Sequence, residues 1–198
     1  MARLIREIKD DKYYHLVNRG VDRKLTFCDS EDYRSFLQLI EIGCSKYGIR
    51  VIALSLMPNH FHILIWTIFG GTVSPWIKWV TGVYAQAFNK RHERTGHLWQ
   101  DRYFAREVQE GRHLGTTWRY VEQNPVRACL VESPRDWQWS SAYYRSSGTK
   151  PNYLVEPPWW GSEIMNEWWS EEQLDSATLD KARRSLRQTG LLEGAADW

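Results

Sequence analysis

The feature that most constrains the fold is a pair of strand-like segments separated by only two residues. RVIALSLM (50–57) and HFHILIWT (60–67) are rich in β-branched and aromatic residues, and Pro58-Asn59 between them is a favourable tight-turn pair. The chain therefore predicts an antiparallel hairpin at this position. With Pro58 and Asn59 as the turn residues, one face of the hairpin is wholly apolar and consists of the cross-strand pairs Leu56–Phe61, Leu54–Ile63 and Ile52–Ile65.

The other face of this hairpin carries two histidines. Because side chains alternate along a strand, His60 and His62 project from the same side, opposite Met57 and Ser55. Alternate positions lie about 7 Å apart, so two neutral imidazoles can converge on one Mg, Mn or Zn ion. A bare His-x-His pair also arises by chance on solvated surfaces. The pair alone thus indicates a metal site only weakly.

The order of the remaining segments predicts an α+β fold. Before the hairpin, a strand over 12–18 is followed by a helix that starts near Asp29 and ends at Gly48. After the hairpin comes a helix over 74–92, which is capped by Ser74 and has Pro75 in its first turn. A strand over 102–109 and a helix over 112–123, which Pro125 stops, complete the order. This β-α-β-β-α-β order is typical of a ferredoxin-like antiparallel sheet with both crossover helices on one face. The opposite face is then available for function.

The domain organisation follows from a change in composition late in the chain. Residues 1–145 contain the predicted sheet and helices, and residues 146–198 form a Trp-rich C-terminal extension. Within the extension, Ser170 and Gln173 are spaced as a capping box, which predicts a helix that ends near Gly190. The role of this extension is open.

A second group of chemically useful residues lies on the helix that precedes Pro125. Tyr120 and Asn124 are four residues apart and therefore share one helix face, with about 5–6 Å between their Cβ atoms. Pro125 disfavours helical geometry at Asn124, so we expect the amide oxygen of Asn124 to be released toward a site. A tyrosine on an amphipathic helix is more often a packing residue, but Tyr120 is distinguished by this Asn-Pro partner.

Composition and charge exclude several classes of protein. A mean hydropathy of -0.57 and a charged fraction of 25% are unlike those of a membrane protein, and the near balance of charge is unlike that of a disordered polyelectrolyte. Three widely spaced cysteines support neither a disulfide framework nor a zinc ribbon. Residues 74–127 carry nine basic against five acidic side chains, whereas residues 128–198 carry seven against eleven, so a phosphate-bearing partner is expected on the middle of the chain.

Three segments together resemble one family. LSLMPNHFHILIW (54–66), GHLWQDRYFAREV (96–108) and RYVEQNPVRACLV (119–131) are similar, in this order, to the HUH single-strand transposases, and specifically to the REP-associated tyrosine transposases. The resemblance covers about residues 12–145, and that family has the fold assembled above. It implies a bacterial cytoplasmic protein associated with the nucleoid, which agrees with the absence of an apolar signal-like stretch at the start of the chain.

The resemblance also implies an activity and assigns site residues. It implies a metal-dependent endonuclease and strand transferase that cleaves single-stranded DNA at REP-type hairpins. Tyr120 matches the nucleophile, which would form a 5'-phosphotyrosine, and His60, His62 and Asn124 match the ligands of a Mg or Mn ion. A phosphodiester is exchanged for another phosphodiester, so no nucleotide fuel is needed, and the chain has no GxxxxGK loop.

Several residues are candidates for holding the DNA. Cations near the site suit backbone phosphates, and an aromatic or amide side chain suits an unpaired base. We expect phosphate contacts from Arg19, Lys78, Lys90, Arg91, Arg94, Arg102 and Arg127, and base contacts from Trp99 and Gln100.

Two other functions and the subunit number remain open at this point. The basic middle alone would suit a module that binds DNA hairpins without cutting them, and the histidine pair alone would suit a metal hydrolase unrelated to DNA. Neither alternative uses Tyr120 and Asn124 together. Relatives in mobile elements work as dimers, but the short segment between the last strand and the Tyr120 helix favours a site within one chain, and hence a monomer.

Overall fold

The computed structural model describes residues 8–157 and residue 177, and its centre is a four-stranded antiparallel sheet. The strands stand in the order β2-β3-β1-β4, so β1 and β3 are central. This order and the sequence of elements confirm the predicted ferredoxin-like fold. The strands are β1 (Lys12–Arg19), β2 (Arg50–Met57), β3 (His60–Thr67) and β4 (Phe104–Val108).

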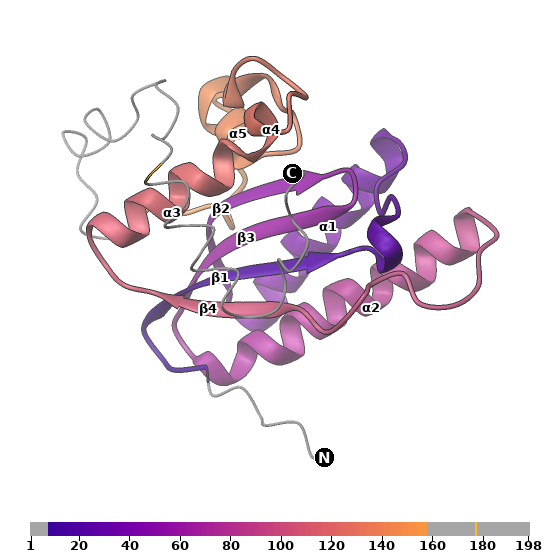
Figure 1. Cartoon of the computed structure of the whole chain (residues 1–198). Helices are drawn as coiled ribbons and strands as arrows, with labels where there is room; N and C mark the ends of the chain where they lie inside the picture. The colour runs from indigo at the N-terminus through magenta and orange to yellow at the C-terminus, as the bar shows by residue number, and fades with distance from the viewer. Residues whose placement is uncertain (1–7, 158–176, 178–198) are drawn as a thin grey trace.

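Helices cover both faces of this sheet (Figure 1). The crossover helices α1 (Ser30–Tyr47) and α2 (Val73–Arg91) pack on one face, as predicted, and α3 (Arg112–Glu122) packs on the other. The remaining elements are α4 (Asn124–Arg127), α5 (Ser141–Ser147) and the short 3-10 helices η1 (Val21–Arg23), η2 (Gly70–Thr72) and η3 (Pro134–Asp136). No helix within the described residues is both long and apolar enough to cross a bilayer.

Helix α1 begins and ends where its capping residues indicate, but α2 begins earlier than predicted. The Asp29 side chain accepts from the backbone N–H groups of Glu31 and Asp32, and Gly48 ends α1 in the left-handed conformation at φ 68°. Helix α2 starts at Val73, directly after η2, and has no side-chain cap. Ser74 is therefore inside the helix, because the 3-10 turn already supplies its first turn.

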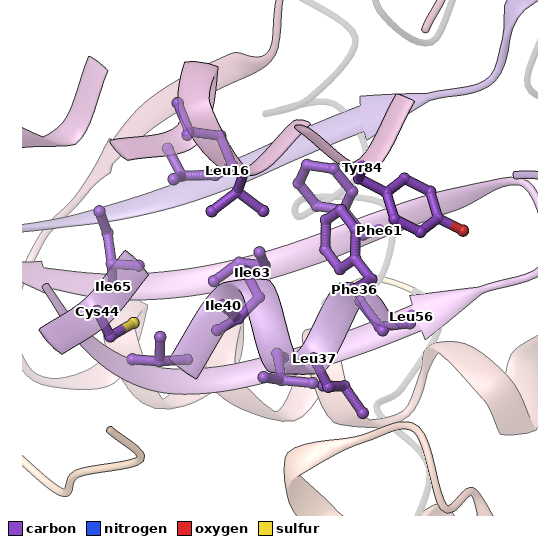
Figure 2. Packing of buried hydrophobic residues seen from close by; sticks show 14 of the residues in the cluster. Leu16, Phe36, Leu37, Ile40, Cys44, Leu56, Phe61, Ile63, Ile65 and Tyr84 are labelled. Atoms are coloured by element: carbon purple, nitrogen blue, oxygen red, sulfur yellow. The ribbon is translucent and has the colours of Figure 1, made fainter. Parts of the chain in front are cut away.

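The main core lies between the sheet and the helices α1 and α2. Figure 2 shows Leu56, Phe61, Ile63 and Ile65 of the hairpin packed with residues of α1 and with Tyr84 of α2. All four hairpin side chains are fully buried, which confirms the apolar hairpin face. Burial of an aliphatic or aromatic side chain of this size contributes about 1.5–3 kcal/mol.

Residues beyond α4 add to the same core. Trp139, Tyr153 and Leu154 belong to it, and Leu154 forms a parallel bridge with Val51 at the outer edge of β2. The start of the Trp-rich extension is thus attached to the outer edge of β2. The helix predicted between Ser170 and Gly190 lies outside the described residues.

One predicted pair in the hairpin is wrong, because β2 contains a bulge. The register follows the prediction from Met57–His60 to Ala53–Leu64, but the next pair is Val51–Ile65. Ile52 is the extra residue, and it packs on the α3 face with Ala53 instead of opposite Ile65. A bulge inserts one residue into one strand and so reverses the alternation beyond it, which a two-residue repeat cannot predict.

Two glycines offer a matched test of the helical layer. A Cβ on Gly43 of α1 would lie 2.7 Å from Trp76 Nε1, whereas a Cβ on Gly82 of α2 would meet nothing within 4 Å. We expect Gly43→Ala to lower the free energy of unfolding by about 1–3 kcal/mol through overpacking. We expect Gly82→Ala to raise it by about 0.5–1 kcal/mol through reduced chain entropy. Urea unfolding measures both, and equal effects would contradict the close approach of α1 and α2.

Candidate active site

The hairpin presents both predicted histidines on the face of the sheet that α3 covers. His60 lies opposite Met57 and His62 opposite Ser55, as predicted, and their ring centroids are 5.1 Å apart. Each residue is 5% exposed. The pair is therefore held by the sheet under α3 and is not a pair of solvated surface residues.

A third histidine, absent from the sequence prediction, completes the cluster. Strand β1 pairs with β3 so that Val17 lies opposite His62, and this register brings His15 Nε2 to 2.9 Å from His62 Nδ1. The two rings stack with their centroids 5.1 Å apart. The alternation of KYYHLVN places His15 and Leu16 on opposite faces of the sheet. Only the register between β1 and β3 shows that His15 shares its face with His62.

Neighbouring groups fix which ring nitrogens can bind a metal. The Asn59 Nδ2 donates to the Arg23 carbonyl at 3.1 Å, so Asn59 Oδ1 is the atom 2.7 Å from His60 Nδ1 and accepts its proton. The lone pair of His60 is then on Nε2. His62 Nε2 has the lone pair in the tautomer in which His62 Nδ1 donates its proton to His15 Nε2, and Nε2 is then the ligand atom of His62. Metal-binding histidines commonly have such outer partners.

Burial keeps all three imidazoles neutral. Desolvation, with the positive charges of Arg19 and Arg127 next, lowers the pKa of His60 to about 3. Desolvation, with Arg106 next, lowers the pKa of His15 to about 3, and desolvation holds the pKa of His62 well below its usual value. At neutral pH the cluster therefore offers unprotonated nitrogen atoms, which is the form that binds metal ions.

Helix α3 brings Tyr120 against these histidines within the same chain. The ring centroid of Tyr120 lies 5.7 Å from that of His62 and 6.1 Å from that of His15, in both cases edge to face. The Arg127 guanidinium lies over the Tyr120 ring at 4.0 Å. The predicted nucleophile, two of the predicted metal ligands and one predicted DNA contact thus meet at one place.

The amide of Asn124 is oriented differently from the expectation that Pro125 would release it. Its Nδ2 donates to the Tyr120 carbonyl at 2.9 Å, and its Oδ1 accepts from Arg127 Nη2 at 2.6 Å. The reason is that Pro125 occupies the first turn of α4, where its missing N–H costs no hydrogen bond, so helical structure resumes at Asn124. Asn124 lies next to Tyr120, but Arg127 holds its oxygen.

A buried ion pair fixes the helix that carries Tyr120. Glu122 is 2% exposed, and Arg145 of α5 donates to its carboxylate at 2.7 Å while lying 4.5 Å above the Trp118 ring. Ser141 also donates to Glu122, and a second Arg145 nitrogen donates to the carbonyl of Ile52. The end of α3 is thereby joined to α5 and to the bulge in β2. No local spacing in the sequence indicates this network, because its members are far apart in the chain.

Two predicted DNA contacts, in addition to Arg127, lie beside the histidines. Arg19 is opposite His60 in the register of β1 and β3, and its Nε donates to Gln100 Oε1 at 3.0 Å. The Gln100 backbone N–H donates to the Arg19 carbonyl at 2.9 Å, which attaches the loop before β4 to the end of β1. Positive charge therefore lies on both sides of the cluster, from Arg19 beside His60 and from Arg106 opposite His15 in the register of β1 and β4.

The other predicted DNA contacts are placed differently. The Trp99 ring packs against Phe36, Phe61 and Tyr84, and its Nε1 donates to the Thr81 carbonyl at 3.0 Å, so it is a core side chain and not an exposed stacking platform. Helix α2 covers the opposite face of the sheet from the histidines. Lys78 and Lys90 of α2 are exposed, and so is Arg102, which precedes β4. Arg91, at the end of α2, is paired with acidic residues at the start of α1. Arg94, which follows α2, lies over the Phe88 ring.

The buried histidines predict an acid-sensitive fold. Between pH 6.5 and 3 the unfolded chain binds protons that the folded chain excludes, so the free energy of unfolding falls as the pH falls. At pH 5 the loss is about 2 kcal/mol for each histidine whose pKa is near 3. We expect His15→Gln to reduce the difference in unfolding free energy between pH 7 and pH 5. The exposed His97→Gln is the control, and equal pH dependence in the two variants would contradict this account.

Comparisons with known proteins agree with this geometry. Residues 9–124, more than half of the chain, match the model of the IS200-like transposase family. A Haemophilus influenzae protein described as a REP-associated tyrosine transposase is 24% identical over 108 residues, which are 50% of this chain and 61% of that protein. This chain therefore spans less than two thirds of the length of that curated relative.

A solved structure has the same fold. A REP-associated tyrosine transposase bound to a REP hairpin superimposes with a TM-score of 0.62 at 16% identity, covering 89% of this chain and all of the other. The segments that resemble this group, the ferredoxin-like sheet and the meeting of Tyr120 with the histidine pair therefore agree with one another. From the match over residues 9–124 we conclude that the chain belongs to the IS200-like transposase family.

Proposed function

We propose that this protein cleaves and rejoins single-stranded DNA through a covalent bond between Tyr120 and a 5'-phosphate. The observation that carries the proposal is the contact of the Tyr120 ring with His62 and His15 in one chain. A tyrosine used only for packing needs no neighbouring metal ligands. A metal hydrolase unrelated to DNA would leave Tyr120 and the cations around it without a role.

The proposed substrate is a DNA hairpin of the REP type. Support comes from the solved relative, which is described as bound to a REP hairpin, and from the curated relative, which is described as REP-associated. Arg19 and Arg127, which flank the histidines, would bind the phosphates on either side of the cleaved bond. The hydrogen-bonded pair of Arg19, which is buried, and Gln100, which is exposed, is suited to hold the strand in one register.

The chemical step exchanges one phosphodiester for another. The Tyr120 hydroxyl oxygen attacks the phosphorus, the bond to the 3'-oxygen breaks, the phenol proton is lost to solvent and the 3'-oxygen takes up a proton to become a free hydroxyl. The reverse attack by a 3'-hydroxyl on the adduct rejoins the strands. The two imidazole Nε2 atoms, with the amide oxygen of Asn124 as third donor, suit a Mg or Mn ion, which when bound would draw charge from a phosphate oxygen.

Arg127 would control whether Asn124 can contribute its oxygen. In the free protein Arg127 holds this oxygen at 2.6 Å. A phosphate is a stronger partner for a guanidinium than a neutral amide, because the hydrogen bond then joins two charges and can be bidentate. DNA binding would therefore move Arg127 to the phosphate and release Asn124 for the cation.

The first experiment looks for the covalent adduct. We expect labelled single-stranded hairpins from the host's repeats to form a protein–DNA adduct on a denaturing gel in the presence of Mn or Mg. Tyr120→Phe removes the nucleophile and His62→Ala removes a ligand, so neither variant should form it. Tyr103→Phe is the matched tyrosine control and should keep it.

Other outcomes would redirect the assignment. Tight hairpin binding with no adduct and no cleavage in any metal would contradict the proposed enzymatic activity and favour a protein that binds hairpins without cutting them. An adduct that survives Tyr120→Phe would show that another tyrosine is the nucleophile.

The role of Arg127 predicts opposite effects on two measurements. We expect Arg127→Ala to bind Mn several-fold more tightly in the absence of DNA, because Asn124 is released and a positive charge is removed. We expect its single-turnover cleavage rate to fall by about tenfold or more, equivalent to about 1.4 kcal/mol, because the phosphate contact is lost.

A double variant separates the two causes of tighter binding. Titration calorimetry on Arg127→Ala, Asn124→Ala and the double variant gives the coupling between the residues. If Asn124 is the released ligand, the gain from Arg127→Ala is smaller when Asn124 is absent. Additive effects would mean that Arg127 acts through its charge alone.

A further inference from the structure

A second group of metal-binding side chains lies away from the histidine cluster, where the start of α1 meets the end of α2. Cys28 Sγ, a carboxylate oxygen of Asp32 and a ring nitrogen of His92 all lie within 4.8 Å of one another. Cys28 directly precedes the N-cap of α1, Asp32 lies in its first turn, and His92 follows α2. No sequence motif indicates this group, because 60 residues separate Asp32 from His92.

Contacts within the fold already orient the three side chains. Asp32 is 3% exposed, and its Oδ2 lies 2.8 Å from the Cys28 backbone nitrogen and 3.0 Å from His92 Nε2. The His92 ring packs on Phe88 with a centroid distance of 4.2 Å. The aspartate and the imidazole are therefore held in place, and the exposed Cys28 side chain can adjust its position.

The surroundings of the group carry more negative than positive charge. Arg91 forms ion pairs with Asp29, Glu31 and Asp32, so three carboxylates share one guanidinium. Its Nη1 is 2.6 Å from Asp32 Oδ1 and 3.1 Å from His92 Nε2. Arg91 can stay on Oδ1 as an outer partner of the carboxylate while Oδ2 binds a cation.

The types of ligand atom select the kind of metal. A thiolate, an imidazole and a carboxylate are the ligands of zinc sites, whereas Mg and Ca take oxygen ligands. Bond lengths of about 2.0–2.3 Å place neighbouring ligand atoms about 3.5 Å apart in a tetrahedral site, so only a small contraction is needed. Three protein ligands leave the fourth position for water.

We propose that Cys28, Asp32 and His92 form a zinc-binding site that joins α1 to α2 and is separate from the cluster of His15, His60 and His62. The loop before Cys28 also contacts the hairpin of β2 and β3, which carries His60 and His62. The backbone N–H groups of Thr26 and Phe27 both donate to the Pro58 carbonyl, at 2.9 and 3.0 Å. A metal at Cys28 would therefore fix the loop that contacts the turn preceding His60.

Cobalt substitution tests this site with a readout that is independent of DNA cleavage. We expect the protein with its cysteines reduced to bind Co with an intense near-ultraviolet thiolate charge-transfer band, and Zn to displace the Co and abolish the band. Cys28→Ser and His92→Gln should lose the band. Cys129→Ser, at the other exposed cysteine, and His60→Asn, in the histidine cluster, should keep it.

Thermal unfolding provides the second measurement. Because zinc would bind only the folded state, and because the histidine cluster can also take a metal ion, the measurement is made on His60→Asn: saturating Zn should raise the Tm of His60→Asn and of His60→Asn/Cys129→Ser by several degrees, and should have little effect on His60→Asn/Cys28→Ser. A wild-type protein that binds Co without the thiolate band, or a band that survives Cys28→Ser, would overturn the site. Each result leaves the adduct experiment on Tyr120 unaffected, so the two proposals fail separately.

Discussion

The antiparallel pairing of the two central strands is the constraint on which the rest of the site depends. It sets Arg19 opposite His60 and Val17 opposite His62, and it brings His15 into hydrogen-bond contact with His62. A shift of this register by one residue would turn His15 and Arg19 toward α1 and α2. The apolar side chains on the other face of β1 oppose such a shift, because it would turn Tyr14 and Leu16 out of the main core toward the α3 face. Core packing and site geometry are thus fixed by the same pairing.

Much of the fold could be predicted from local patterns. The hairpin, the ends of α1 and the order of the elements follow from alternation, helical spacing and capping residues, which act over a few residues. The same patterns place His60 and His62 on one face, and Tyr120 on a helix just before Asn124. The bulge at Ile52 escaped prediction because a bulge is stabilised by its surroundings, and here the Ile52 carbonyl accepts from Arg145, 93 residues later.

The rest of the candidate site depends on contacts between distant segments, which spacing cannot supply. His15 joins His62 across 47 residues, and Glu122 meets Arg145 only once α5 is packed against β2. The expectation for Asn124 differed from the structure for a related reason. The conformational effect of Pro125 on its neighbour is local, whereas the orientation of the amide is decided by Arg127, whose guanidinium also requires the Tyr120 ring as a partner.

The network behind Tyr120 has a mechanical consequence. In the proposed reaction Tyr120 would hold the end of a DNA strand, and it would have to withstand the pull of that strand until the joining step. From Tyr120 the load would pass to Glu122, through Arg145 to the carbonyl of Ile52, and so into a backbone that is hydrogen-bonded along the sheet. The bulge in β2 would thereby serve as an anchor point. Tension on the DNA would then be borne by a strand of the sheet as well as by the backbone of α3.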